Sequence, residues 1–247
     1  PYSFWREEGV GDVLDVLNSS PQDAHSSLGL YIHIPFCRKR CRFCYFRVYT
    51  DKNSSDIQTY LNGLIRELEL YGELPSVRGR KLSFVYFGGG TPSYISARHL
   101  RAFVERARER ISWEGAREVA FECEPGTLTR AKLEAIKEIG VTRLSLGIEN
   151  LNDEILGSNG RAHRSREVYQ VMPWIRELAF EQLNVDLIAG MVGESWDSWR
   201  DTVKRTIALA PDSVTIYQME LPHNTVYSKE LKEGGDLDFA NWEIKRA

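Results

Sequence analysis

The sequence contains no apolar run that approaches the roughly 20 residues of a membrane-spanning helix. It also lacks an excess of charge of one sign, because 32 Lys and Arg stand against 35 Asp and Glu, for a formal net charge of -3. This balance argues against a protein that coats nucleic acid or binds membrane surfaces. We therefore expect a soluble, cytoplasmic protein with no nucleic-acid partner and no membrane partner.

Cysteine is scarce as well, and four cysteines in 247 residues are too few for a disulfide scaffold. Internal repeats and low-complexity segments are absent. The length suits one large α/β domain with a substantial core. Three of the four cysteines nevertheless fall within residues 37–44, and this clustering needs a chemical explanation. The last residues, 241–247, resemble the beginning of a helix, so we expect the chain to be part of a longer protein.

Short apolar and β-branched runs recur along the chain and alternate with segments of helical periodicity. The expected strands are residues 30–36, 82–87, 118–123, 143–148, 183–189 and 213–218. The expected helices are residues 57–71, 97–110, 131–139, 167–180 and 196–209. The expected N-caps are Ser96, Thr129, Ser165 and Ser195, and Gly140 is expected to follow the end of a helix.

Six strands that alternate with helices predict right-handed βαβ units and a parallel sheet, which is an α/β fold. Periodicity alone leaves open whether the sheet is doubly wound or forms a six-stranded partial barrel. In both folds the residues after each strand meet at one rim. Polar or glycine residues follow the expected strands there, among them His33, Gly88–Gly90, Glu122, Glu149 and Asp186.

The segment 37–44 (CRKRCRFC) directly follows the first expected strand and spaces its cysteines as CxxxCxxC. Such a loop can hold three irons of a 4Fe-4S cluster and leave the fourth iron without a protein ligand. An open iron is a binding position for a substrate or cosubstrate. Zinc is the main alternative, and it would need a fourth ligand such as His33 or Cys123 close by. Cys123 stands alone within a strand, and we expect it to be a core residue.

Five cations surround the three cysteines of this slightly acidic chain: Arg38, Lys39, Arg40, Arg42 and Arg47. One interpretation is an ordinary solvated surface. The other is that they offset the charge of a cluster and receive an acidic electron donor of the flavodoxin or ferredoxin type.

Further motifs occur in a fixed order along the chain. They are 31–37 (YIHIPFC), 86–93 (YFGGGTPS), 121–125 (FECEP), 143–149 (RLSLGIE), 159–163 (NGRAH) and 184–190 (NVDLIAG). With these motifs, the chain from about residue 30 to residue 225 resembles the radical S-adenosylmethionine (SAM) superfamily. More narrowly, it resembles the oxygen-independent coproporphyrinogen III oxidase family, which includes haem chaperones and the class C radical methyltransferases and cyclopropanases.

The resemblance implies a fold and a set of cofactors. The fold is a partial (β/α)6 barrel of the TIM type in residues 30–226, with an N-terminal extension in 1–29 and the start of a C-terminal segment in 227–247. The cofactors are a 4Fe-4S cluster and SAM, with a second SAM in some members. The cluster ligands, which also count as catalytic residues, are Cys37, Cys41 and Cys44. The first SAM matches Tyr31, Gly89 and Glu122, and the second matches Phe43, Gly90, Thr91, Arg161 and Asp186.

The chain departs from the oxidase pattern at several positions. Phe46 stands where the oxidase has a further cysteine, and Glu149 stands where it has a glutamine within its second SAM site. Met191 and Val192 replace a usual Leu-Pro pair, and Glu220 replaces a small residue. These departures weaken the prediction of authentic coproporphyrinogen decarboxylation.

The chemistry implied by the resemblance is the reductive cleavage of SAM to a 5′-deoxyadenosyl radical, which abstracts hydrogen from a small-molecule substrate. The favoured expectation is an enzyme that transfers a methyl or methylene carbon from a second SAM to an unsaturated substrate. The alternatives are the oxidative decarboxylation of tetrapyrrole propionates and a non-catalytic haem chaperone. The residues do not identify the substrate.

Overall fold

The computed structural model describes residues 7–21, 26–238 and 240, and its centre is one parallel sheet of six strands. The strands are β1 (Leu28–Ile34), β2 (Leu82–Gly89), β3 (Glu118–Cys123), β4 (Arg143–Glu149), β5 (Gln182–Ala189) and β6 (Ser213–Gln218). Their order in space is their order in the chain. A doubly wound sheet would reverse direction at a switch point. The order found here belongs to a partial (β/α)6 barrel, which confirms the expected fold.

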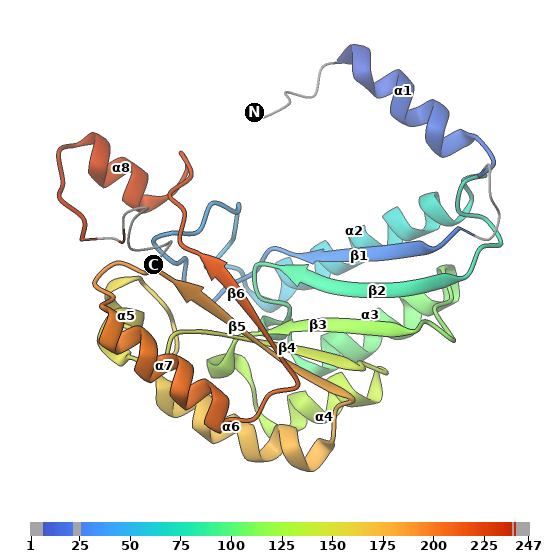
Figure 1. The fold of residues 1–247 in the computed structure, drawn as a ribbon. Coiled ribbons are helices and arrows are strands. Elements are labelled where there is room, and N and C mark those ends of the chain that lie inside the picture. Colours follow the sequence, from blue (N-terminus) through green and yellow to red (C-terminus); the bar gives the residue numbers. More distant parts are fainter. Residues whose placement is uncertain (1–6, 22–25, 239, 241–247) are drawn as a thin grey trace.

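The helices between successive strands cover the outer, convex face of the sheet (Figure 1). They are α2 (Ser54–Gly72), α3 (Ala97–Arg110), α4 (Arg130–Glu138), α6 (Ser165–Leu178) and α7 (Trp196–Ala208). Three short helices follow strands β2 to β4 at the rim: η1 (Pro92–Tyr94), η2 (Pro125–Thr127) and α5 (Asp153–Ser158). The concave face is left open, and the loop that carries the cysteines crosses it at the carboxyl ends of the strands.

Two helices lie outside this alternation. Helix α1 (Glu7–Asn18) lies near the amino-terminal ends of the strands, and α8 (Val226–Lys232) lies beyond the opposite rim (Figure 1). The helix expected to begin in 241–247 is outside the described residues, as are 1–6 and 22–25 of the expected N-terminal extension. Among the described helices, none is both long enough and apolar enough to cross a membrane.

The core lies between the convex face of the sheet and the helices. Along β4, for example, Leu144, Leu146 and Ile148 are fully buried in this core. Successive side chains of a strand point to opposite faces, so the residues between them, Ser145 and Gly147, face the concave side and line a cavity there. The alternation separates the residues that stabilise the sheet from those available for chemistry.

Four of the five expected helix caps are confirmed, although the helix expected at 57–71 begins at Ser54 and the one expected at 167–180 ends at Leu178. The side chains of Ser96, Thr129 and Ser195 each accept a hydrogen bond from a backbone N–H of the first helical turn. Gly140 follows α4 with φ of 77°, a left-handed conformation that glycine adopts without strain.

The expected N-cap at Ser165 is wrong, because helix α6 begins one residue earlier than that assignment requires. Its N-cap is Arg164, and the Glu167 carboxylate accepts a hydrogen bond from the Arg164 backbone N–H at 2.8 Å. The backbone N–H of Ser165 is already satisfied by the Asp153 carboxylate at 2.7 Å. Asp153 therefore satisfies the first backbone N–H of the helix, and Glu167 satisfies the backbone N–H of the N-cap residue.

Candidate cofactor site at the carboxyl rim

A cavity of about 600 Å³ lies between the cysteine loop and the carboxyl ends of the strands. The structure brings to it every residue that the sequence predicted for the site except Tyr31: Cys37, Phe43, Gly89, Gly90, Thr91, Cys41, Cys44, Glu122, Glu149, Arg161 and Asp186. Tyr31 lies further down the concave face of β1, where its ring stacks on Tyr86 with centroids 5.9 Å apart. One cavity therefore collects residues that are far apart in the sequence.

The cysteine loop is anchored by backbone hydrogen bonds to distant segments. The N–H of Cys37 donates to the carbonyl of Tyr49 at 3.0 Å, and the N–H of Arg42 donates to the carbonyl of Asn159 at 3.1 Å. Cys37 and Cys41 are buried, Cys44 is half-buried, and all three are free thiols. Burial raises the pKa of Cys37 to about 11 and also raises that of Cys44. Cys37 and Cys44 are therefore protonated near neutral pH, and a metal centre must displace their protons when it binds.

Two side chains already donate hydrogen bonds to the sulfurs. The Thr91 hydroxyl lies 3.4 Å from Cys37 Sγ, and Arg161 Nη1 lies 3.4 Å from Cys41 Sγ. Donors and positive charge beside a sulfur stabilise its thiolate form. For Cys37, Thr91 and Arg161 oppose the rise in pKa that burial causes without cancelling it.

The glycines of the rim leave room for close approach. A side chain at Gly90 would place its Cβ 3.0 Å from Cys37 Sγ and 2.9 Å from the carbonyl carbon of Pro35. Gly89 has φ of 114°, and its Cβ would meet the ring of His33 at 2.6 Å. Both positions require glycine, and together they bring the end of β2 against the cysteine loop.

Two carboxylates from the middle of the sheet face the cavity with fixed orientation. Glu122 accepts hydrogen bonds from the Tyr86 hydroxyl at 2.6 Å and from the Gly89 backbone N–H at 3.2 Å. Burial raises the pKa of Glu122, with Asp186 adding to the effect. Asp186 accepts from the Ser145 hydroxyl at 2.9 Å and from the Asn184 amide at 2.8 Å. Sequence analysis missed Ser145 and Asn184, which hold Asp186 in place from neighbouring positions of β4 and β5.

Glu149 is the strained member of the site. Its φ is 58°, which is uncommon for any residue other than glycine, and it lies at an irregularity in the pairing of β4 with β5. Its carboxylate lies 3.6 Å from Arg161 Nη2. Burial raises the pKa of Glu149 to about 7, Arg161 opposes this shift, and Asp186 and Glu122 add to it.

The residues of the cavity fit an iron-sulfur cluster with a bound cosubstrate. A cubane cluster takes each thiolate on a separate iron, so its cysteines stand apart around it. Within the described residues, no group of three or more His, Cys, Asp or Glu side chains is arranged to hold one metal ion. Arg161 Nε is buried without a hydrogen-bond partner in the described part of the chain, which leaves a donor for a ligand.

The cations of the cysteine loop divide into two groups. Arg38 pairs with Glu124, Arg42 pairs with Glu230, and Arg40 donates to the backbone carbonyls of Cys44 and Asn224. These three arginines fasten the loop to the rest of the chain. Lys39 and Arg47 are exposed. The sequence does not reveal this division, because the ion pairs of Arg38 and Arg42 span 86 and 188 residues and leave no local signal.

The comparisons with known proteins agree with this geometry. The chain is 30% identical over 219 residues to the heme chaperone HemW of Haemophilus influenzae, with 88% of this chain and 57% of that protein covered. It is 29% identical over 206 residues to the oxygen-independent coproporphyrinogen III oxidase of Escherichia coli, with 83% and 44% covered. The chain thus spans about half the length of the curated relatives it matches.

Among solved structures, coproporphyrinogen III oxidase (HemN) from Escherichia coli, described as a radical SAM enzyme, matches with a TM-score of 0.82 and 26% identity over 98% of this chain and 54% of that one. The tryptophan-bound methyltransferase TsrM from Kitasatospora setae, at 14% identity and a TM-score of 0.57, shares the fold. The profile of the Radical SAM superfamily matches residues 31–206. The chain therefore belongs to the Radical SAM superfamily, whose 4Fe-4S cluster and SAM are the two cofactors expected from its sequence.

Proposed function

We propose that this chain is the cofactor-binding core of an enzyme that cleaves SAM reductively at a 4Fe-4S cluster held by Cys37, Cys41 and Cys44. The observation that carries the proposal is the single cavity that joins these three free thiols to the glycine and carboxylate rim of the barrel. Three cysteine ligands would leave one iron of the cluster open, and the cavity that they border is lined with donors and acceptors suited to a sulfonium amino acid.

When bound together, the cluster and SAM supply a 5′-deoxyadenosyl radical that abstracts hydrogen from carbon. The chain itself positions the ligand and excludes water from the site. Gly89 and Gly90 admit the ligand close to the backbone, Glu122 accepts from its ammonium or hydroxyl groups, and Arg161 pairs with a carboxylate. The walls of the barrel keep water and other hydrogen donors away from the reacting carbon.

The reaction that follows SAM cleavage differs among the members of this family. Sequence analysis favoured methyl or methylene transfer from a second SAM, and the gathering of Phe43, Thr91, Arg161 and Asp186 in one cavity is compatible with it. The relatives at 29 to 30% identity are named as a heme chaperone and a coproporphyrinogen III oxidase, whereas the methyltransferase TsrM is only 14% identical. These names give the two alternatives more support than the methyltransferase has, so the proposal stops at SAM cleavage and hydrogen abstraction from an organic substrate.

A haem chaperone is the second candidate function. Its support is the name of the relatives from Haemophilus influenzae and Bacillus subtilis, together with Phe46, which stands where the oxidase pattern has a cysteine. A chaperone would bind haem tightly and cleave little SAM.

An electron donor of the flavodoxin or ferredoxin type is part of the proposal. The exposed residues of the cysteine loop include Lys39, Arg47 and the stacked rings of Tyr45 and Phe46, which lie at the mouth of the cavity together with Lys39. A cationic and aromatic surface suits an acidic partner. Donor-driven reduction should slow as ionic strength rises, whereas rates independent of salt would contradict this docking surface.

The experiment uses the chain reconstituted with iron and sulfide without oxygen, reduced, and supplied with SAM labelled in its methyl group. Formation of 5′-deoxyadenosine, detected by mass spectrometry, is the expected result. Labelled product with S-adenosylhomocysteine would identify methyl-derived transfer, and carbon dioxide from a tetrapyrrole would identify the oxidase. Tight haem binding without 5′-deoxyadenosine would replace the enzyme proposal by the chaperone.

A further inference from the structure

Another buried carboxylate, that of Glu124, faces the cysteine loop just after the end of β3. Arg38 binds it with two hydrogen bonds, from Nε to Oε2 at 3.1 Å and from Nη2 to Oε1 at 3.3 Å. The side chain of Glu124 is only 9% exposed, and Arg38 is the residue between Cys37 and Lys39. The pair therefore ties the first cluster ligand to the sheet across 86 positions of sequence.

The surroundings of Glu124 are shaped for this pair. A Cβ on Gly126 would lie 2.3 Å from Arg38 Nη2, so glycine makes room for the guanidinium. The Gly126 N–H donates to the Glu124 carboxylate at 3.3 Å, and the Ser93 hydroxyl accepts from the Glu124 backbone N–H at 3.0 Å. Both ends of the residue are held, so the carboxylate has a fixed direction.

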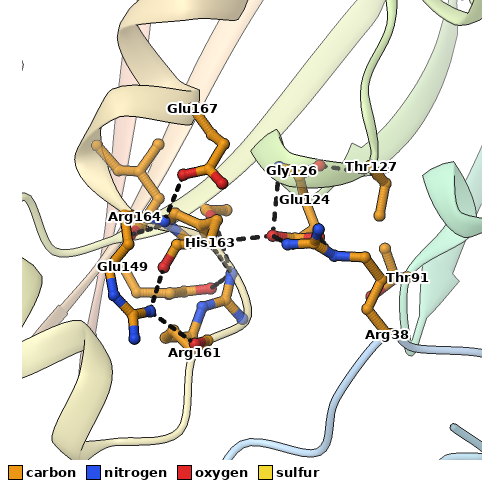
Figure 2. A network of polar contacts seen from close by, with 12 residues as sticks. Arg38, Thr91, Glu124, Gly126, Thr127, Glu149, Arg161, His163, Arg164 and Glu167 are labelled. Atoms are coloured by element: carbon orange, nitrogen blue, oxygen red, sulfur yellow. Dashed lines mark hydrogen bonds and ion pairs between the residues drawn. The ribbon is translucent and has the colours of Figure 1, made fainter.

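On its other side, Glu124 contacts His163, which lies next to Arg161 (Figure 2). His163, which is fully buried, has Nδ1 3.2 Å from Glu124 Oε1. The same nitrogen lies 3.5 Å from Arg161 Nη2, and Arg161 reaches Cys41 Sγ. Desolvation works to raise the pKa of Glu124, but the hydrogen bond from His163 and the charges of Arg161 and Arg38 outweigh it, and the pKa is lowered. Glu124 is thus ionised and is connected to two of the loop cysteines. Arg38 connects it to Cys37, and His163 with Arg161 connects it to Cys41.

We propose that Glu124 is a positioning residue that fixes the cysteine loop through Arg38 and places a balanced charge pair beside the iron-sulfur centre. The inference deepens the proposed function and rests on it for its electrochemical part. Its structural part concerns the loop itself, which must hold three sulfurs in position before any metal arrives. A bidentate arginine-carboxylate pair gives that hold direction as well as strength.

The structural part is tested by hydrogen exchange on the purified chain without metal. In Glu124→Gln and Arg38→Met, the amides of 37–44 should exchange about tenfold faster than in the parent, the factor that loss of one charge-assisted hydrogen bond of about 1.4 kcal/mol gives. Gly126→Ala should have the same effect, because it displaces Arg38 while leaving every charge in place. The matched control is Glu138→Gln, which breaks the exposed Arg101–Glu138 pair on the far side of the helices. Unchanged exchange in both Glu124→Gln and Gly126→Ala would overturn the proposal.

The electrochemical part is tested by redox titration of the reconstituted cluster, followed by electron paramagnetic resonance. Glu124→Gln removes a negative charge and should raise the midpoint potential, whereas Arg38→Met removes a positive charge and should lower it. If Glu124 and Arg38 only supported the fold, the two substitutions would shift the midpoint potential in the same direction, or neither would shift it. Shifts of the same sign, or none, would contradict the charge pair beside the cluster. Because the exchange experiment needs no cluster, failure of the proposed function would remove only this second result.

Discussion

The two faces of the same strands differ in nearly every property. On the convex face, β3 and β4 present Val119, Phe121 and Leu144 to the helices, and all three are buried in the apolar core. On the concave face, the intervening residues are Glu122, Ser145 and Gly147, which line the cavity. Two-residue periodicity therefore separates stability from chemistry along one strand. Substitutions on one face should affect folding, and substitutions on the other should affect cofactors.

The largest expected effect is a loss of iron that occurs on substitution of Cys41 but not of Cys123. Cys41→Ala should abolish the cluster, because two remaining loop thiolates cannot hold it, and iron and sulfide per chain should fall to background. Cys123→Ala is the control: Cys123 is buried within the core cluster and also borders the cavity, and its loss should leave iron content unchanged. Anaerobic iron and sulfide analysis after identical reconstitution measures both. Equal loss of iron in the two variants would break the distinction between the faces.

The next largest effect is a loss of folding stability on substitution of a residue of the convex face. Leu144→Ala removes a fully buried side chain and should lower the free energy of unfolding by about 3 kcal/mol. Urea unfolding of the metal-free chain measures this loss. At low urea concentration the folded variant should still bind iron like the parent. Loss of iron binding by the folded variant would show that the two faces are coupled.

Glu149 provides a pH-dependent test of the concave face. Its pKa is higher in the folded chain, about 7, than the ordinary 4.5, so the folded state binds more protons between these values and stability falls as pH rises through them. The full change corresponds to about 3 kcal/mol. Glu149→Gln should therefore stabilise the metal-free chain at pH 8 and have little effect at pH 4.5. Urea unfolding at the two pH values measures the difference, and equal effects at both would contradict the raised pKa.

The smallest expected effect concerns a ligand contact. Asp186→Asn keeps the shape of the side chain but removes its charge, and the affinity of the cluster-loaded chain for a second SAM should fall about tenfold. Calorimetric titration measures the affinity. Val214→Ala, on the exposed outward side of β6, is the control and should bind SAM as the parent does. An unchanged affinity in Asp186→Asn would remove this carboxylate from the site.

The sequence predicted the sheet well because apolar periodicity is a local signal. The strand 118–123 and the helix 97–110 agree with the structure to the residue, and Cys123 is in the core as expected. The winding of the sheet needed the resemblance, because periodicity does not state which strands are neighbours. The left-handed conformation of Glu149 and the bidentate pair of Arg38 with Glu124 were not predicted. Both depend on contacts between segments that only the folded chain brings together.

The central claim is that three cysteines at the concave rim hold a cluster with one open iron for SAM. Mössbauer spectroscopy of the chain reconstituted with ⁵⁷Fe tests it most directly, with spectra recorded before and after SAM is added. We expect a 4Fe-4S spectrum in which one iron of the four changes its signal when SAM binds. A chain that takes up zinc but no iron, or a cluster whose four irons do not respond to SAM, would contradict it.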